Sequence, residues 1–407
     1  MMKFFLVLLL SLGVTESYAY PDYIKTVLCY PVDDYYAEPI IELGGRTQIC
    51  FEFDDLSPEV NNYSYRIIHC DPDGNASNIS SFHYVEGFNS QQITDYEFSF
   101  DTQIPYTHYT LLLPNEDMKI KLSGNYRIEV FKDENPDSII ISQPFAMIEN
   151  KVSISSRLKN PSNTQYLNTS QEFGFTVHYD NVVINNPMRD VKCYVVQNQD
   201  PNSRRDFSPT FVRPNQLVYG DGINNIFNGL APFRNFQSYS FVYFTQYVRQ
   251  ILKDPEGRYN IVLQPGKVYP SYVPQPGQNG GFVVKAENVA KPKLEADYAM
   301  VHFAVYAPQK IADADVYIYG KFSGWQFHPD LKMEYDTINR AYVGQTMLKQ
   351  GDYDYMYAVL PVGEETPDLV SLQGNFYQHR NIYTIRCYLF DYQLGYYRLV
   401  GYKSVVG

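Results

Sequence analysis

Residues 124–130 read Gly-Asn-Tyr-Arg-Ile-Glu-Val, and this stretch decides the fold class. A turn-forming Gly-Asn pair opens it, and apolar and charged side chains then alternate. Successive residues of a strand point to opposite faces, so Tyr126, Ile128 and Val130 share one face and the charged residues share the other. The pattern predicts a β-strand in a sheet that buries only one face.

The same period of two recurs elsewhere in the chain. Residues 47–53 place Ile49, Phe51 and Phe53 on one face, and residues 63–69 alternate in the same way. A glycine that leads into an aromatic-first strand also appears twice. The two copies are residues 124–128 and residues 351–355. We interpret these two as equivalent late strands of separate sandwich modules.

Breaks in this pattern divide the chain. One break lies near Asn150, and a second lies in the Gly- and Pro-rich stretch 264–292. The sequence therefore predicts an all-β protein of about three consecutive immunoglobulin-like or early-set β-sandwich modules. The predicted modules are residues 20–150, 151–292 and 293–407.

The first residues predict a secretory signal peptide. Lys3 gives a positive start, residues 4–14 are mostly apolar, and residues 17–19 form the small-x-small pattern of a cleavage site. No later stretch reaches the ~20 apolar residues of a transmembrane helix. We expect cleavage of residues 1–19 and a mature chain that does not span a membrane.

Composition and charge narrow the class of partner. Tyr occurs 39 times and Phe 25 times, and both favour strands and half-buried surfaces. The net charge of −12 argues against nucleic acid and anionic membranes. Residues 20–150 hold 22 Asp and Glu against 7 Lys and Arg, so the first module is the acidic one. This excess is either a solvated surface or a face toward a basic or cation-bearing partner.

No stretch carries an enzymatic or metal-binding signature. His69 and Cys70 are adjacent in a predicted strand and therefore point to opposite faces. Residues 71–75 resemble a calcium loop but lack the bidentate Glu of an EF-hand, so we interpret them as a tight turn. The nucleophile elbow, the P-loop and the Rossmann glycine pattern do not occur. We expect a non-enzyme without metal or cofactor.

Cysteine usage gives no disulfide framework. The spacing contains no C-x-x-C, and Cys193 and Cys387 are isolated in the sequence. In an oxidising compartment one bridge among Cys29, Cys50 and Cys70 stays open as an alternative.

Residues 320–325, Gly-Lys-Phe-Ser-Gly-Trp, resemble the G-x-F-x-x-W element of early-set immunoglobulin-like domains, including glycan-binding ones. Trp325 is the only tryptophan and has the flat apolar face that stacks on a sugar ring. Packing of this ring in the sandwich core is the favoured alternative. The glycan-binding function nevertheless stands as the second hypothesis.

A longer series of motifs in the first module resembles the plug protein of the type IX secretion system of Bacteroidota. The motifs lie at residues 53–56, 63–71, 84–88, 93–96, 99–102, 106–109, 114–115 and 123–126. In the third module, residues 295–298, 348–351 and 374–383 resemble the same family.

The resemblance implies a periplasmic subunit, peripheral to the outer membrane, that docks on the translocon barrel and occludes its pore when no cargo is present. Such a task needs a broad contact surface and no catalytic centre. The aromatic segment 233–247 suits part of that surface, as one or two strands or a short helix. The interface residues predicted there are Phe233, Arg234, Phe236 and Tyr243.

Overall fold

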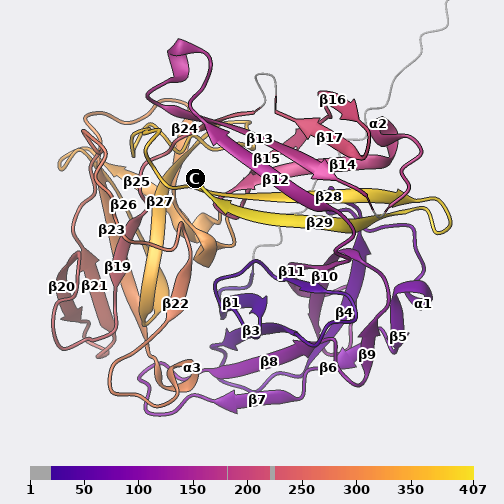
Figure 1. Cartoon of the computed structure of the whole chain (residues 1–407). Helices are drawn as coiled ribbons and strands as arrows, with labels where there is room; N and C mark the ends of the chain where they lie inside the picture. Colours follow the sequence, from indigo (N-terminus) through magenta and orange to yellow (C-terminus); the bar gives the residue numbers. More distant parts are fainter. Residues whose placement is uncertain (1–19, 181, 221–224) are drawn as a thin grey trace, which may run out of the picture.

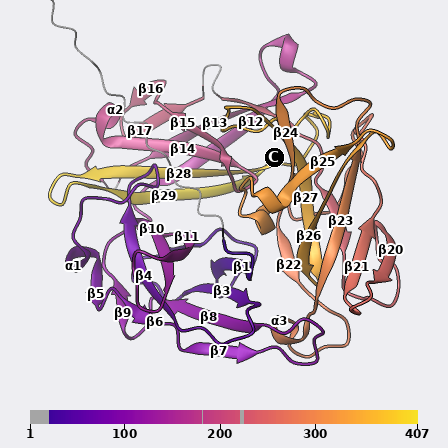
Figure 2. The same cartoon turned by 180° about the vertical axis from the view of Figure 1, so that it is seen from behind.

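The computed structural model describes residues 20–180, 182–220 and 225–407, and these are almost entirely β-strands (Figure 1). The predicted all-β class is confirmed. The predicted signal peptide lies outside the described residues. No helix of the described chain is long and apolar enough to cross a membrane. Strand pairing groups the chain into three units, which Figures 1 and 2 show packed around a common centre.

Unit 1 is a sandwich of two sheets built from residues 24–148. Its first sheet has the order β1 (Ile24–Pro31), β3 (Ile49–Asp55), β8 (Thr107–Leu113) and β7 (Asp95–Phe98). Its second sheet has the order β2 (Ile40–Glu42), β11 (Ile139–Ile148), β10 (Gly124–Lys132), β4 (Tyr63–Cys70) and β6 (Gln91–Gln92). A short helix α1 (Ser81–Tyr84) and the β5 (Val85–Gly87) and β9 (Met118–Ile120) pair lie beside them.

The core of unit 1 confirms that the alternating apolar residues share one buried face. Ile49, Phe51 and Phe53 are fully buried between the two sheets, opposite Ile128 and Val130 of β10. β10 begins at Gly124, as the turn signal predicts. At a positive φ this glycine also lies so close to the His69 ring that a Cβ would clash with it.

Unit 2 is assembled from two distant stretches of the chain, so it is discontinuous. One sheet has the order β12 (Ser153–Lys159), β13 (Ser170–His178), β17 (Gln216–Tyr219) and β16 (Phe211–Arg213), with β18 (Ile226–Asn228) also paired to β13. The facing sheet has the order β15 (Asp200–Phe207), β14 (Val191–Gln197), β28 (Ile382–Asp391) and β29 (Tyr396–Val406), with α2 (Pro187–Asp190) before β14. The last two strands of the chain thus complete its second unit.

Unit 3 is one curled nine-stranded sheet. Its order is β19 (Arg234–Gln237), β27 (Gly351–Pro361), β24 (Ala314–Tyr319), β25 (Lys332–Asp336), β26 (Ala341–Lys349), β23 (Tyr298–Tyr306), β21 (Tyr259–Leu263) and β20 (Val248–Lys253), with β22 (Phe282–Val284) on β27. The curl brings β27 and β23 face to face although three strands lie between them in the sheet: Tyr355 of β27 packs against Phe303 of β23, with 5.0 Å between ring centroids.

Strand pairing crosses the predicted boundary at residue 292. β19 and β22 come from the range 151–292, yet both pair with β27 of the range 293–407. β28 comes from that last range and pairs with β14 of the middle one. Units 2 and 3 therefore each contain strands from both sides of residue 292. That the segments on either side of this boundary fold independently stays a prediction.

Candidate interaction surfaces and the junctions that position them

Three of the four predicted interface residues are buried in the described chain, and their part in docking stays a prediction. Phe236 is fully buried and stacks on Tyr353, with 5.2 Å between ring centroids. Phe233 packs edge-on against Trp325. The Arg234 guanidinium donates to the Lys267 carbonyl. These side chains hold β19 and the following loop to the core, because apolar area removed from water stabilises that contact.

Tyr243 is the predicted interface residue that reaches the surface. After β19 the chain leaves the sheet, and Val242, Tyr243 and Phe244 stand half or more exposed. We name these three residues the loop tip. The Tyr243 hydroxyl donates to Glu287, and Phe241, just before the tip, packs on Tyr259. The tip is therefore an anchored apolar projection.

Trp325 is buried, with 7% of its surface exposed. Its ring packs against Tyr319 and Phe233, and a Cβ at Gly280 would clash with it. A ring packed this way offers no open face to a sugar, so the stacking role assigned by the glycan-binding alternative has no support here. The Trp325 ring packs in the core, as the favoured alternative predicted.

The edge strand β7 and the residues just after it carry a second set of exposed aromatic side chains. Tyr96, Phe98 and Phe100 are between 44% and 70% exposed, and we name them the aromatic edge. β7 ends its sheet, so its outer side pairs with no described strand. Exposed sheet edges are natural sites for adding a partner strand. The sequence motifs at 93–96 and 99–102 contain two of these residues but carry no signal for their exposure.

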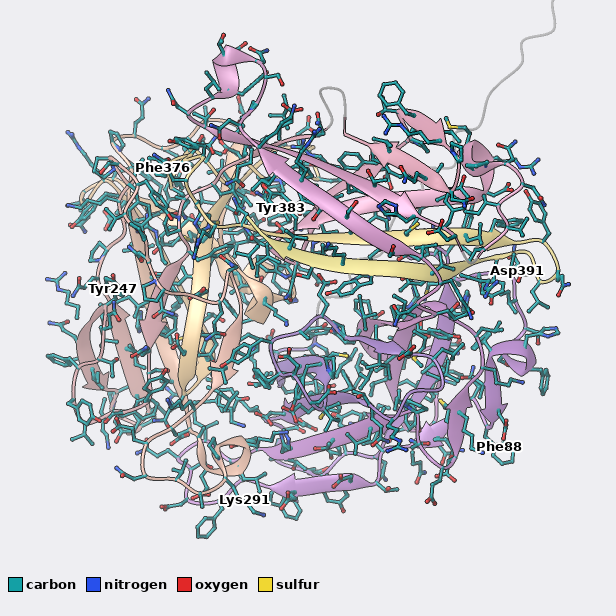
Figure 3. The ribbon with its side chains drawn as sticks, in the orientation of Figure 1. Phe88, Tyr247, Lys291, Phe376, Tyr383 and Asp391 are labelled. Atoms are coloured by element: carbon teal, nitrogen blue, oxygen red, sulfur yellow. The ribbon has the colours of Figure 1, made fainter. Side chains whose placement is uncertain are left out.

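Contacts with unit 3 anchor one end of this edge. The backbone N–H of Phe100 donates to Leu294 O at 2.9 Å, within the short helix α3 (Pro292–Glu295). Lys291 Nζ, labelled near the base of Figure 3, lies 3.1 Å from Glu97 Oε2. The aromatic edge is thus fixed relative to both units.

An ion network whose members are buried except for the half-exposed Lys293 joins unit 1 to unit 3, and we name it the ionic junction. Its members are Glu52, Asp54, His108, Lys293 and Lys349. Lys349 Nζ lies 2.7 Å from Asp54 Oδ2, and neither side chain is more than 1% exposed. The ammonium also lies 4.0 Å from the centroid of the Tyr106 ring. A buried charge without such a partner is strongly destabilising.

His108 bridges the two carboxylates of this junction. Its Nδ1 lies 2.7 Å from Asp54 Oδ1, and its Nε2 lies 3.7 Å from Glu52 Oε2, beyond hydrogen-bond distance. Burial lowers the pKa of His108, but the hydrogen bond to Asp54 and the nearby negative charges outweigh it and raise the pKa above its ordinary value. Burial by itself would raise the pKa of the Glu52 carboxyl. The contacts with His108 and Lys293 outweigh burial and lower this pKa to about 2. The junction therefore favours a charged histidine.

A different junction joins unit 1 to unit 2, and we name it the aromatic junction. Tyr194 of β14 and Tyr388 of β28 share a hydroxyl–hydroxyl bond of 2.9 Å, and Tyr388 also donates to Asn125 Oδ1 of unit 1. These rings pack against Ala146 and Ile148 of β11. At its rim, Arg386 donates to Glu38, Arg204 and Lys192 pair with Asp73, and Arg398 pairs with Glu149.

The predicted tight turn at 71–75 forms part of that rim. The Asp71 carboxylate accepts hydrogen bonds from the backbone of Asp73 and Asn75. Among the described residues no group of His, Cys, Asp or Glu side chains is arranged to hold a metal ion. The turn instead serves to present Asp73 to unit 2.

Comparisons with known proteins complete the picture. The family profile of the type 9 secretion system plug protein first domain matches residues 24–149. The crystal structure of a hypothetical protein from Parabacteroides merdae is similar, with a TM-score of 0.92, 30% identity, and coverage of 95% of this chain and 98% of that one. The partial N-terminal region of an enterococcal surface protein aligns with a TM-score of only 0.19. No curated protein matches the sequence.

Proposed function

This chain belongs to the type IX secretion system plug protein family, and from that membership we propose that it docks on the periplasmic mouth of the outer-membrane translocon barrel and closes the pore when no cargo occupies it. The observation that carries the proposal is the family match of residues 24–149. A wide barrel leaks unless a folded body covers one end, and closure by covering needs contact area and no chemical step.

Two features of the fold support closure by a rigid body. The ionic and aromatic junctions bury polar and apolar groups between the units, so relative motion of the units would expose charges or unpaired hydroxyls. The loop tip and the aromatic edge offer exposed Phe and Tyr side chains, which supply contact area at modest entropic cost. Docking through such rings is reversible, as displacement by cargo requires.

The test is affinity purification of the tagged chain from the native envelope, with the co-eluting proteins identified by mass spectrometry. We expect the translocon barrel to co-elute. We also expect deletion of the gene to admit a bulky polar antibiotic, but only in cells that still make the barrel. Failure of the barrel to co-elute, together with an unchanged permeability, would overturn the proposal.

Two variants then separate the candidate surfaces. The first replaces Tyr96, Phe98 and Phe100 with Ser, and the second replaces Val242, Tyr243 and Phe244 with Ser. All six side chains are exposed, so both variants should fold, and each serves as the matched control of the other. Loss of capture in one variant assigns docking to that surface. Full capture by both rejects both surfaces.

A further inference from the structure

Two cysteines lie directly opposite each other in unit 2. Cys193 of β14 pairs with Cys387 of β28 in an antiparallel register that continues without a shift from Val191↔Leu389 to Gln197↔Tyr383. The sequence separates the two residues by almost half the chain. β28 runs from Ile382 to Asp391, so Cys387 lies in its middle, between Tyr383 and Asp391, which Figure 3 labels.

Both thiols point to the same side of their sheet. Cys193 and Cys387 belong to one core cluster, with Val195 and Ile385 from the same two strands, and are 2% and 1% exposed. Facing residues on one side of an antiparallel pair have Cβ atoms roughly 4.5–5.5 Å apart. A disulfide takes Cβ atoms about 3.5–4.5 Å apart and Cα atoms about 4.4–6.8 Å apart, so a small approach is enough.

The interaction with the neighbouring Cys193 thiol, and then burial, raise the pKa of Cys387. On the other side of β28, Gly401 of β29 stands opposite Cys387, and a Cβ on this glycine would clash with Val152. The register of β28 with β29 also shifts between Cys387 and Tyr388, and such a bulge increases the local twist.

The other cysteines lack this arrangement, and all five thiols are free in the structure. Cys29 faces the core of unit 1, whereas Cys50 faces the core shared with unit 3, so the two lie on opposite faces of one sheet. The bridge left open within the first module is therefore not formed between these two residues.

We propose that Cys193 and Cys387 form a cross-strand disulfide when the chain folds in the presence of a thiol–disulfide oxidant. The two thiols lose two protons and two electrons as the S–S bond forms, and the oxidant's disulfide is reduced to two thiols. Once β14 and β28 have paired, both thiols are buried out of reach of an oxidant, so the bond forms before the sheet closes. The bond joins the two distant stretches that make unit 2.

The test refolds the full chain from the reduced, denatured state, once with a mixture of oxidised and reduced glutathione and once with reductant alone. After quenching with an alkylating reagent under denaturing conditions, we expect three free thiols in the oxidised sample and five in the reduced one, with a linked peptide containing Cys193 and Cys387. The oxidised sample should melt roughly 5 °C or more above the reduced one, because closing a long loop constrains the unfolded chain.

Two variants serve as controls. Cys193→Ala should leave four alkylated thiols under both conditions, and Cys29→Ala should still yield the 193–387 peptide. Five alkylated thiols in the natural chain after oxidative refolding, or a linked peptide joining any other pair, would overturn the proposal. The docking function is not involved in this readout, so the two can fail separately.

Discussion

Unit 1 packs against its two neighbouring units through junctions of different chemistry. The ionic junction removes Asp54 and Lys349 from water and balances them charge for charge. The aromatic junction buries Tyr194 and Tyr388 and leaves most of its ion pairs at the rim. A buried ion pair depends on both partners being present, whereas a rim pair is screened by water and salt. The comparison teaches that equal numbers of salt bridges do not mean equal stability.

The largest effect should come from Lys349→Met, which takes the ammonium away from the buried Asp54 carboxylate and leaves His108 as its remaining cationic partner. We expect the free energy of unfolding to fall by about 3–5 kcal/mol, measured by urea denaturation. The double variant Asp54→Asn/Lys349→Met should recover a large part of that loss. A loss below about 1 kcal/mol in the single variant would remove the distinction between the junctions.

A smaller effect is expected from Tyr388→Phe at the aromatic junction. The change removes the hydroxyl that donates to Asn125 and contacts Tyr194, but it keeps the ring. An unpaired buried acceptor costs about 1–3 kcal/mol, so unfolding should become easier by that amount. Tyr306→Phe is the control, because its ring is half exposed. Equal losses in the two variants would contradict the prediction.

The third prediction concerns pH. The pKa of His108 is raised in the folded chain, so the folded form holds the proton more tightly. This stabilisation is fully present below the unfolded pKa of about 6.5 and is lost as the pH rises through the folded pKa. It amounts to roughly 1.4 kcal/mol for each unit by which the two pKa values differ.

The measurement compares the melting temperatures of the natural chain and His108→Gln from pH 5.5 to 8.5. The advantage of the natural chain should shrink as the pH rises. The difference between the two proteins is the correct readout because burial lowers the pKa of His69 and of His379 to about 4, which gives both proteins an opposite pH dependence. A pH-independent difference would show that His108 is neutral in the junction.

The smallest effect is expected from Lys192→Ala. Its ammonium lies 3.7 Å from Asp73, and both side chains are nearly half exposed. The free energy of unfolding should change by less than about 0.5 kcal/mol, and the change should vanish at 1 M salt. A loss of unfolding free energy as large as that of Tyr388→Phe would show that the ion pairs at the rim, and not the buried tyrosines, stabilise the aromatic junction.

Local pattern predicted much of unit 1 and little of how the units exchange strands. The alternation at 47–53 and 124–130 fixes which face is buried, since period two is a local property. The pairing of β14 with β28 joins segments almost 200 residues apart, and no local pattern encodes which distant strand will be the neighbour. The predicted division into three consecutive modules therefore carries no information about which distant strands pair.

The interface residues show a second limit. Phe236 and Tyr243 lie in one aromatic segment, yet one is buried and the other exposed, because aromatic density alone suits a core and a contact surface equally. Sequence reasoning also missed the ionic junction. Glu52 and Asp54 share the face opposite the core residues Phe51 and Phe53, where solvent was the natural expectation. Only the packing of unit 3 against that face buries them.

The long stretch of chain between β14 and β28 imposes an order on assembly. During synthesis β14 is complete long before its partner strand exists, so one edge of its sheet and the apolar side chains around Val195 stay uncovered until β28 has been made. Unpaired edges of this kind attract other chains and chaperones. A premature stop anywhere before residue 382 would leave unit 2 open, even where units 1 and 3 had every strand they need.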